Sequence, residues 1–297
     1  MQVPVAYLAV LLIWSTAPLG IVWSSETINP SMAVLLRMLI AVILGSLVIL
    51  VSKIKLPWHK EAVRLYSFSA LGIFGGMSFS YLAAGYISSG VLSLAFGLAP
   101  AFSALLARRI LEEPKISTVR KLSMSLSFIG LALVCADNFS LKGDSFYGLI
   151  FILTAVFLFS LSGVLVKSIS LAIHPLSTTV GALIVSLPLF IVNWLLLDGT
   201  FDVSNWQFKS IWATIYLGVF GSLIGFFAYF FVLQKLTAST VTLITLITPV
   251  VALSLGVMLN DEIITDKILL GALLVILGLA IYHWGELLIN KVSGTRR

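Results

Sequence analysis

Long apolar stretches separated by short polar breaks run along the whole chain. Each stretch has close to the roughly 20 apolar residues that an α-helix needs to cross the hydrocarbon core of a bilayer. The breaks are too short to fold into a soluble domain. The pattern predicts an all-α integral membrane protein with ten transmembrane helices, at residues 4–23, 30–52, 65–86, 90–110, 118–136, 146–168, 175–197, 209–233, 238–259 and 267–289.

The two halves of the chain carry similar sequences. Residues 91–113 read VLSLAFGLAPAFSALLARRILEE, and residues 240–262 read TVTLITLITPVVALSLGVMLNDE. In this alignment Pro100 matches Pro249, and each copy has an acidic residue at its end. Repetition of a helical unit within one chain is common in secondary transporters, which bind their substrate between the repeats.

An odd number of spans in each half fixes the relative orientation of the halves. With five spans per half, the second copy enters the membrane in the opposite sense to the first. We therefore expect two inverted five-helix repeats, at residues 1–140 and 141–297. A looser match, between the Gly-Ile-Phe-Gly of residues 72–75 and the Gly-Val-Phe-Gly of residues 218–221, fits the same division.

Composition supports the membrane assignment. The chain is 60% hydrophobic and only 10% charged, whereas soluble domains carry about 25% charged residues. Because Cys135 is the single cysteine, an intrachain disulfide and a cysteine-built metal site are both excluded. No basic segment precedes the first apolar stretch, so we interpret that stretch as an uncleaved span.

The distribution of positive charge predicts the topology. If the N-terminus is cytoplasmic, the outer loops hold only Lys142, Lys209 and Lys267, Arg37 lies within a span, and the other fourteen of the 18 Lys and Arg residues lie inside. This positive-inside bias predicts that both termini are cytoplasmic, in the cell (inner) membrane. Topology and contacts with membrane lipid explain the pI of about 9.5, so no nucleic-acid partner is expected.

The sequence contains no pattern that indicates an enzyme. No span or single loop combines metal ligands, paired carboxylates, or a nucleophile with its base, and there is no nucleotide-binding G-x-x-x-x-G-K-[ST] loop. We expect no catalytic residues, no metal and no cofactor. No Asp or Glu lies in the middle of a span, so the proton relay of many coupled carriers has no visible carboxylate here.

Two kinds of residue inside the spans are candidates for gating. Pro100 and Pro249 lie about ten residues into their predicted helices, where a proline removes a backbone hydrogen bond. We expect these kinks to line a central cavity and to flex as it opens. Arg37 is the only basic residue deep in a span, and it either binds a substrate carboxylate or serves a structural or gating role. The acidic ends, Glu113 and Glu262, are expected to anchor helix ends or loops.

The remaining candidates for substrate contact are aromatic and hydroxyl side chains within spans. They suit an amphipathic or zwitterionic small molecule, and they suit a multiply charged phosphate ester poorly because only Arg37 offers a counter-charge. The residues predicted to bind substrate are Trp14, Ser15, Phe79, Tyr81, Phe96, Phe159, Ser160, Tyr229, Thr242 and Thr245. The other aromatic and hydroxyl candidates in these spans are Thr16, Ser80, Ser93, Ser162, Phe226, Phe227, Phe230 and Thr248.

These motifs resemble the EamA family of the drug/metabolite transporter superfamily over essentially the whole chain. The resemblance rests on a proline-centred motif with a downstream acidic residue, present twice, and on the tryptophan and arginine of the first two spans. In this sequence these residues are Leu98, Pro100, Leu105 and Glu113, then Ile247, Pro249 and Glu262, together with Trp14 and Arg37. One departure is Ser15, since the family commonly has Trp-Gly in the first span.

The resemblance implies a function and a role for the arginine. Family members mostly export amino acids and related small metabolites across the inner membrane, so we expect a secondary transporter that works by alternating access. Because the family generally keeps the arginine across varied substrates, a structural or gating role is favoured for Arg37. A carrier of nucleotide sugars or phosphorylated metabolites and a non-transporting membrane scaffold are the alternatives. Substrate, direction, coupling ion and oligomeric state stay open.

Overall fold

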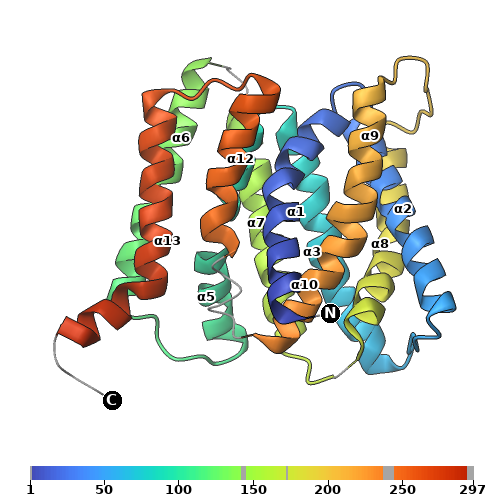
Figure 1. Ribbon diagram of the computed structural model, residues 1–297, viewed down its shortest axis with the longest axis horizontal. Helices are drawn as coiled ribbons and strands as arrows, with labels where there is room; N and C mark the ends of the chain where they lie inside the picture. The colour runs from blue at the N-terminus through green and yellow to red at the C-terminus, as the bar shows by residue number, and fades with distance from the viewer. Residues whose placement is uncertain (1, 142–144, 172, 237–243, 293–297) are drawn as a thin grey trace.

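The computed structural model describes residues 2–141, 145–171, 173–236 and 244–292, and every regular element in these ranges is a helix. The helices stand side by side in one bundle, with the start of α1 and the end of α13 near the same edge (Figure 1). The helices of the first half are α1 (Val3–Ser24), α2 (Pro30–Val51), α3 (Lys60–Ala84), α4 (Ser89–Phe96), α5 (Ala99–Ile110) and α6 (Thr118–Leu141).

The second half contains a π-helical segment as well as α-helices. The segment η1 lies within the third long helix of this half, between α9 and α10. The elements are α7 (Ser145–Lys167), α8 (Pro175–Leu197), α9 (Phe208–Tyr216), η1 (Leu217–Ile224), α10 (Gly225–Lys235), α12 (Ile244–Asn260) and α13 (Asp266–Val292).

Eight helical segments of the described chain are apolar and long enough to cross a membrane. A ninth, Ile247–Asn260, is apolar but shorter. The all-helical membrane class is therefore confirmed, while the count of ten spans stays a prediction. The two predicted spans without a match among the eight correspond to α6 and to α12, which contains this shorter segment. Residues 237–243, where the predicted span 238–259 begins, lie outside the described residues.

The second helix of each half begins in the same way. Pro30 and Pro175 are the first residues of α2 and α8, where a proline is tolerated because the first N–H groups of a helix have no intrahelical partner. The side chains of Asn29 and His174 each accept a hydrogen bond from the backbone N–H two residues on. The same local chemistry thus starts equivalent helices in both halves.

Pro100 begins a helix instead of bending the middle of one, which corrects the sequence-based prediction. The predicted span 90–110 is broken after Phe96, and Pro100 lies in the first turn of α5. Turns with N···O distances of 3.0 Å at Gly97 and Leu98 join the two pieces. Pro249, in contrast, lies inside α12 as expected.

Contacts between helices occur in corresponding pairs. α6 packs along α13 and α2 along α8, and these are pairs of helices that the predicted repeat treats as equivalent. α3 packs on α7, and its counterpart, the α9–η1–α10 helix, packs on α1. α5 packs on α7 just as α12 packs on α1. If the halves are divided as the sequence predicts, each of these contacts has a counterpart in the other half.

Glycines bring α6 and α13 close together. A Cβ added to Gly130 would lie 2.6 Å from the carbonyl oxygen of Gly271 and 2.8 Å from the Cβ of Leu274. Gly278, on α13, packs in the same way against the backbone of Ser123 and Ser127. Small residues at such crossings let helix backbones approach closely in a lipid environment, where no hydrophobic effect draws helices together.

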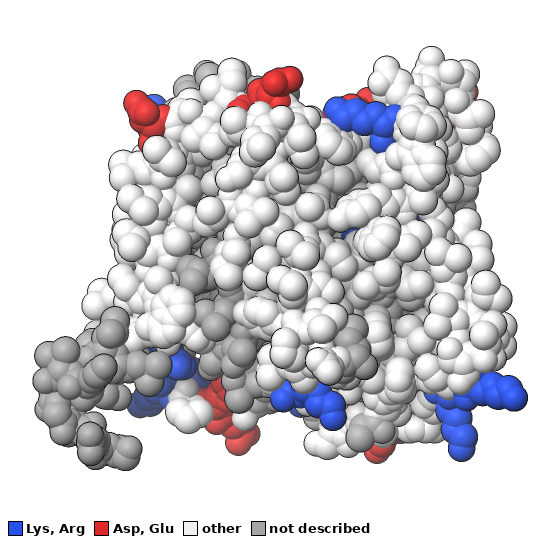
Figure 2. Space-filling model, viewed as in Figure 1, with Lys and Arg blue, Asp and Glu red and all other residues white. Residues whose placement is uncertain are grey.

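The sides of the bundle are apolar. Large hydrophobic side chains point outward, among them Leu50, Val51 and Leu196, which are at least 74% exposed. On the face shown in Figure 2, charged side chains lie at the two ends of the bundle and the band between them is almost uncharged. An exposed apolar band of this extent is typical of a surface that faces lipid.

We predict that Gly130→Ala lowers the stability of the bundle by about 1–3 kcal/mol, because the added methyl group pushes two helix backbones apart. Thermal unfolding of the purified protein in detergent measures the effect. Gly85→Ala is the control, since a Cβ there meets only one carbonyl, at 3.6 Å. Equal melting temperatures for the two variants would contradict the close packing of α6 and α13.

Candidate substrate cavity

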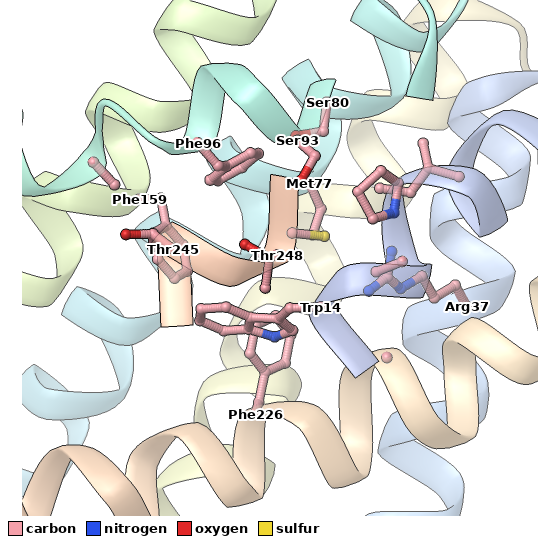
Figure 3. A pocket seen from close by; sticks show the side chains of 15 residues that line it. Trp14, Arg37, Met77, Ser80, Ser93, Phe96, Phe159, Phe226, Thr245 and Thr248 are labelled. Carbon is pink, nitrogen blue, oxygen red and sulfur yellow. The ribbon is translucent and has the colours of Figure 1, made fainter. Parts of the chain in front are cut away.

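A cavity of about 90 Å³ lies inside the bundle where helices of both halves meet. Its walls come from α1 to α5 in the first half and from α7, η1, α10 and α12 in the second. Figure 3 shows the side chains that surround it. The lining residues are Trp14, Ala17, Pro18, Ile21, Arg37, Met77, Ser80, Ser93, Phe96, Ala99, Phe159, Gly221, Phe226, Thr245 and Thr248.

Aromatic rings form one wall of the cavity. The ring of Trp14 lies 5.1 Å from that of Tyr229 and 5.8 Å from that of Phe159, centroid to centroid. Phe159 also lies 5.9 Å from Phe96, with the rings edge to face. These separations fall in the range of favourable aromatic pairs. Helices α1, α4, α7 and α10 are therefore held together by rings at the level of the cavity.

Three of the surrounding helices carry a proline one turn after a lining residue. A proline has no N–H, so it cannot donate the α-helical hydrogen bond to the residue four positions earlier. The regular helical ladder is therefore interrupted at one level, where the residues surround a cavity and not lipid. The pairs are Trp14 and Pro18 in α1, Phe96 and Pro100 in α4 and α5, and Thr245 and Pro249 in α12.

Among the described residues, Arg37 is the only charged one that lines the cavity, and its side chain is only 2% exposed. Its Nε donates a hydrogen bond of 2.7 Å to Ser222 Oγ, and its guanidinium lies 6.0 Å from the ring of Tyr81. Nη1 has no hydrogen-bond partner among the described residues. An arginine at the centre of a membrane helix costs about 2.5–3.5 kcal/mol on insertion scales, so this charge needs an explanation.

The π-helical segment provides the space for this guanidinium. A Cβ on Gly221 would lie 3.0 Å from Arg37 Nη2, and a Cβ on Gly218 would lie 3.1 Å from the Arg37 carbonyl oxygen. A larger residue at either position would displace α2 or its arginine. Short π-helical segments inside α-helices are frequent at functional sites, and this one places Gly221 and Ser222 against the same side chain.

The carboxylate of Glu262 caps the N-terminus of α4, one of the helices that line the cavity. Glu262 accepts hydrogen bonds from the backbone N–H groups of Ser89 (3.0 Å) and Gly90 (3.2 Å), at the N-terminus of α4. Asn260 donates to the same carboxylate and accepts a hydrogen bond of 2.7 Å from Trp23 Nε1. Negative charge is favourable at a helix N-terminus. The prediction that Glu262 anchors a helix end is confirmed, and the anchor joins α1, α4 and the segment after α12.

A second set of contacts ties α9 to the loop between α1 and α2. Lys209 forms an ion pair of 2.7 Å with Glu26 and lies over the ring of Trp23. Ser210 donates a hydrogen bond of 2.7 Å to the Trp23 carbonyl. Helices of both halves are therefore connected at this end of the bundle.

The structure brings some of the predicted binding residues to the cavity and places others behind its walls. Trp14, Phe96, Phe159 and Thr245 line it. Ser15 instead donates a hydrogen bond to the carbonyl of its own helix four residues earlier. Four others lie away from the lining. The ring of Phe79 lies beside that of Phe151 at a tilt, and the ring of Tyr81 lies beneath Arg37. Ser160 donates a hydrogen bond to the Ala99 carbonyl, and Tyr229 lies behind Trp14. Thr242 lies outside the described residues.

Several lining residues were not in the predicted binding set. Ser80, Ser93, Phe226 and Thr248 had the expected chemistry but were left among the general candidates. The small and aliphatic lining residues have no chemistry that separates them from packing. They are Ala17, Pro18, Ile21, Met77, Ala99 and Gly221. A spacing of four between an aromatic or hydroxyl residue and a proline, present three times, is the signal that points to Pro18.

Within the described residues, no group of three or more His, Cys, Asp or Glu side chains is placed to hold a metal ion. The lining offers ring faces, hydroxyl groups and one guanidinium. Such an arrangement can bind and orient a small organic molecule.

Comparisons with known proteins identify the family. The chain is 27% identical over 272 residues to an "Uncharacterized transporter" of Archaeoglobus fulgidus, covering 90% of this chain and 94% of the relative. It is 22% identical to "Uncharacterized transporter YoaV" of Bacillus subtilis, covering 94% and 95%. A solved crystal structure shares the fold, with a TM-score of 0.66, 17% identity, and coverage of 94% of this chain and 96% of that one. The EamA-like transporter family matches residues 3–136 and 146–284, and the chain therefore belongs to this family of membrane transporters.

Proposed function

We propose that this protein is a secondary transporter that exports amino acids or related small metabolites across the inner membrane by alternating access. The observation that carries the proposal is the cavity between the two halves, lined by rings, hydroxyl groups and a single arginine. Binding sites between repeats are typical of secondary transporters. The names of the relatives, which call them transporters, agree with carriage and not with catalysis.

The proposed architecture is ten spans in two inverted five-helix repeats, residues 1–140 and 141–297. Two observations support it. The family matches the chain twice, at residues 3–136 and 146–284, and the helix contacts fall into pairs that exchange of the halves preserves. With both termini cytoplasmic, the end of the bundle that holds Glu262 faces outward.

The cavity favours a small substrate. Each ordered water needs at least about 10–15 Å³ of such volume, so 90 Å³ accommodates only a compact molecule in this conformation. In the described part of the lining, one guanidinium is the only charge. This disfavours nucleotide sugars and phosphorylated metabolites, because each phosphate group needs several donors or cations. We therefore propose a zwitterionic or amphipathic metabolite, with membrane lipid around the bundle.

We predict that proteoliposomes containing the purified protein exchange labelled small amino acids or carboxylic acids faster than empty liposomes do. A panel of amino acids, organic acids, amines and sugar phosphates, each tested with the same compound unlabelled on the opposite side, measures exchange without assuming a coupling ion. Flux confined to sugar phosphates would contradict the proposed substrate class, and no flux for any compound would favour the scaffold.

We predict that Glu262→Gln opens the outer side of the cavity, because the amide loses the charge that holds the N-terminus of α4 and retains only one acceptor oxygen. The reporter is Ser93→Cys, in the lining, combined with Cys135→Ser. A membrane-impermeant maleimide added to intact cells should label this reporter several-fold faster when Glu262 is replaced.

Asp202→Asn is the matched control for this measurement. Asp202 is an exposed carboxylate at the same end of the bundle, and the hydrogen bond that it accepts comes from Ser204, two residues away. The Asp202→Asn substitution should leave the labelling rate of the reporter unchanged. If Glu262→Gln lowers the melting temperature while labelling stays at the control rate, the contact is structural and does not control access.

A further inference from the structure

We propose that Arg37 binds a carboxylate group of the transported molecule, so that the substrates of this protein are small apolar compounds that carry a carboxylate. This inference rests on the proposed function, since it names the substrate class of the same cavity. It differs from the sequence-based prediction, in which a structural or gating role was favoured for Arg37.

The first argument is the incomplete set of partners around a buried charge. Arg37 is only 2% exposed, and its Nε donates a hydrogen bond to the neutral hydroxyl of Ser222. No carboxylate lines the cavity, and Nη1 has no partner among the described residues. A buried guanidinium is ordinarily paired with an anion. A ligand carboxylate would supply both the missing charge and the missing acceptor.

The second argument is that the guanidinium is held in position by its surroundings. Ser222 fixes Nε, Gly221 leaves room for Nη2, and the ring of Tyr81 lies on the guanidinium at 6.0 Å. A long side chain that is fixed in this way loses little conformational freedom when a ligand binds. The two terminal nitrogens of an arginine match the two oxygens of a carboxylate, which gives a bidentate contact.

The third argument is that packing at this level does not require an arginine. In the proposed repeat alignment, the position equivalent to Arg37 is Ala182 in α8, which is completely buried. α8 packs against α2 in the same bundle. The second half therefore fills this position with a methyl group. A purely structural role for the charge would leave the difference between the two halves unexplained.

The remaining lining defines the rest of the substrate. Apart from Arg37 it is neutral, and most of it is apolar or aromatic. The rings of Trp14 and Phe159 can contact an aliphatic body, and their faces also tolerate an ammonium group. Both simple carboxylates and amino acids therefore fit, provided that the carboxylate is present.

Four matched compounds test the inference. Valine and valinamide differ in the carboxylate and share the ammonium, while 3-methylbutanoate and 3-methylbutanamide differ in the same way and lack it. Calorimetry on the purified full-length protein should show that each acid binds roughly 10- to 100-fold more tightly than its amide, the range of a hydrogen bond to a charged group. Equal affinity within both pairs would overturn the proposal.

Substitutions test whether Arg37 causes the tighter binding of the acids. Arg37→Gln should reduce the ratio of acid to amide affinity to about threefold or less, while amide affinity changes little. Arg64→Gln, which removes an exposed arginine from α3, should leave the ratio intact. If Arg37→Gln does not fold, Ser222→Ala provides the second test, since it frees Nε and should reduce the ratio severalfold. A folded Arg37→Gln protein with an undiminished ratio would contradict the proposal.

Exchange measurements test the proposed transport function, and binding measurements test the proposed role of Arg37, so the two proposals can fail separately. Exchange of valine and valinamide at equal rates would show that the protein transports but that Arg37 does not select a carboxylate. Arg37-dependent binding of the acids without exchange of any compound would leave the binding site in place and refute the transport function.

Discussion

Backbone N–H and C=O groups have no water to bond to in the core of a bilayer, and this constraint determines where the chain can depart from a regular helix. The described chain meets it with helices throughout. Three of its interruptions, at Pro18, at the break before Pro100 and at Pro249, lie one turn after a residue that lines the cavity. The helical spans and the position of these interruptions are therefore two results of the same requirement.

The sequence predicted the helices well because their signal is long and simple. Nine of the ten predicted apolar stretches have bounds close to those of an observed helix or of a run of consecutive helices. Asn29-Pro30 and His174-Pro175 mark helix starts directly. The break between α4 and α5 was missed, because Gly97 and Leu98 are as apolar as the residues around them. The π-helical segment η1 was missed for a similar reason, since hydrophobicity says nothing about which carbonyl a backbone N–H will bond to.

The cavity was harder to predict than the helices. Trp14, Phe96, Phe159 and Thr245 were identified by their chemistry, yet Ser15 and Ser160, of the same chemistry, bond to carbonyls and leave the cavity. In a chain that is 60% hydrophobic, packing and binding use the same residue types. A side chain's direction around its helix decides between them, and a rotation of one position, about 100°, separates Trp14 from Ser15. Arg37 stood out because its charge has no packing equivalent.

The contact between Glu262 and the start of α4 joins residues 173 positions apart in the chain. Ser89 and Gly90 are therefore synthesised long before the carboxylate that accepts their hydrogen bonds. At the ribosome, the fourth apolar segment enters the bilayer with these amide groups exposed to water or lipid headgroups. The first half thus reaches its final hydrogen bonding only when nearly the whole second half has been inserted, which makes assembly of the bundle a late event in the biogenesis of this protein.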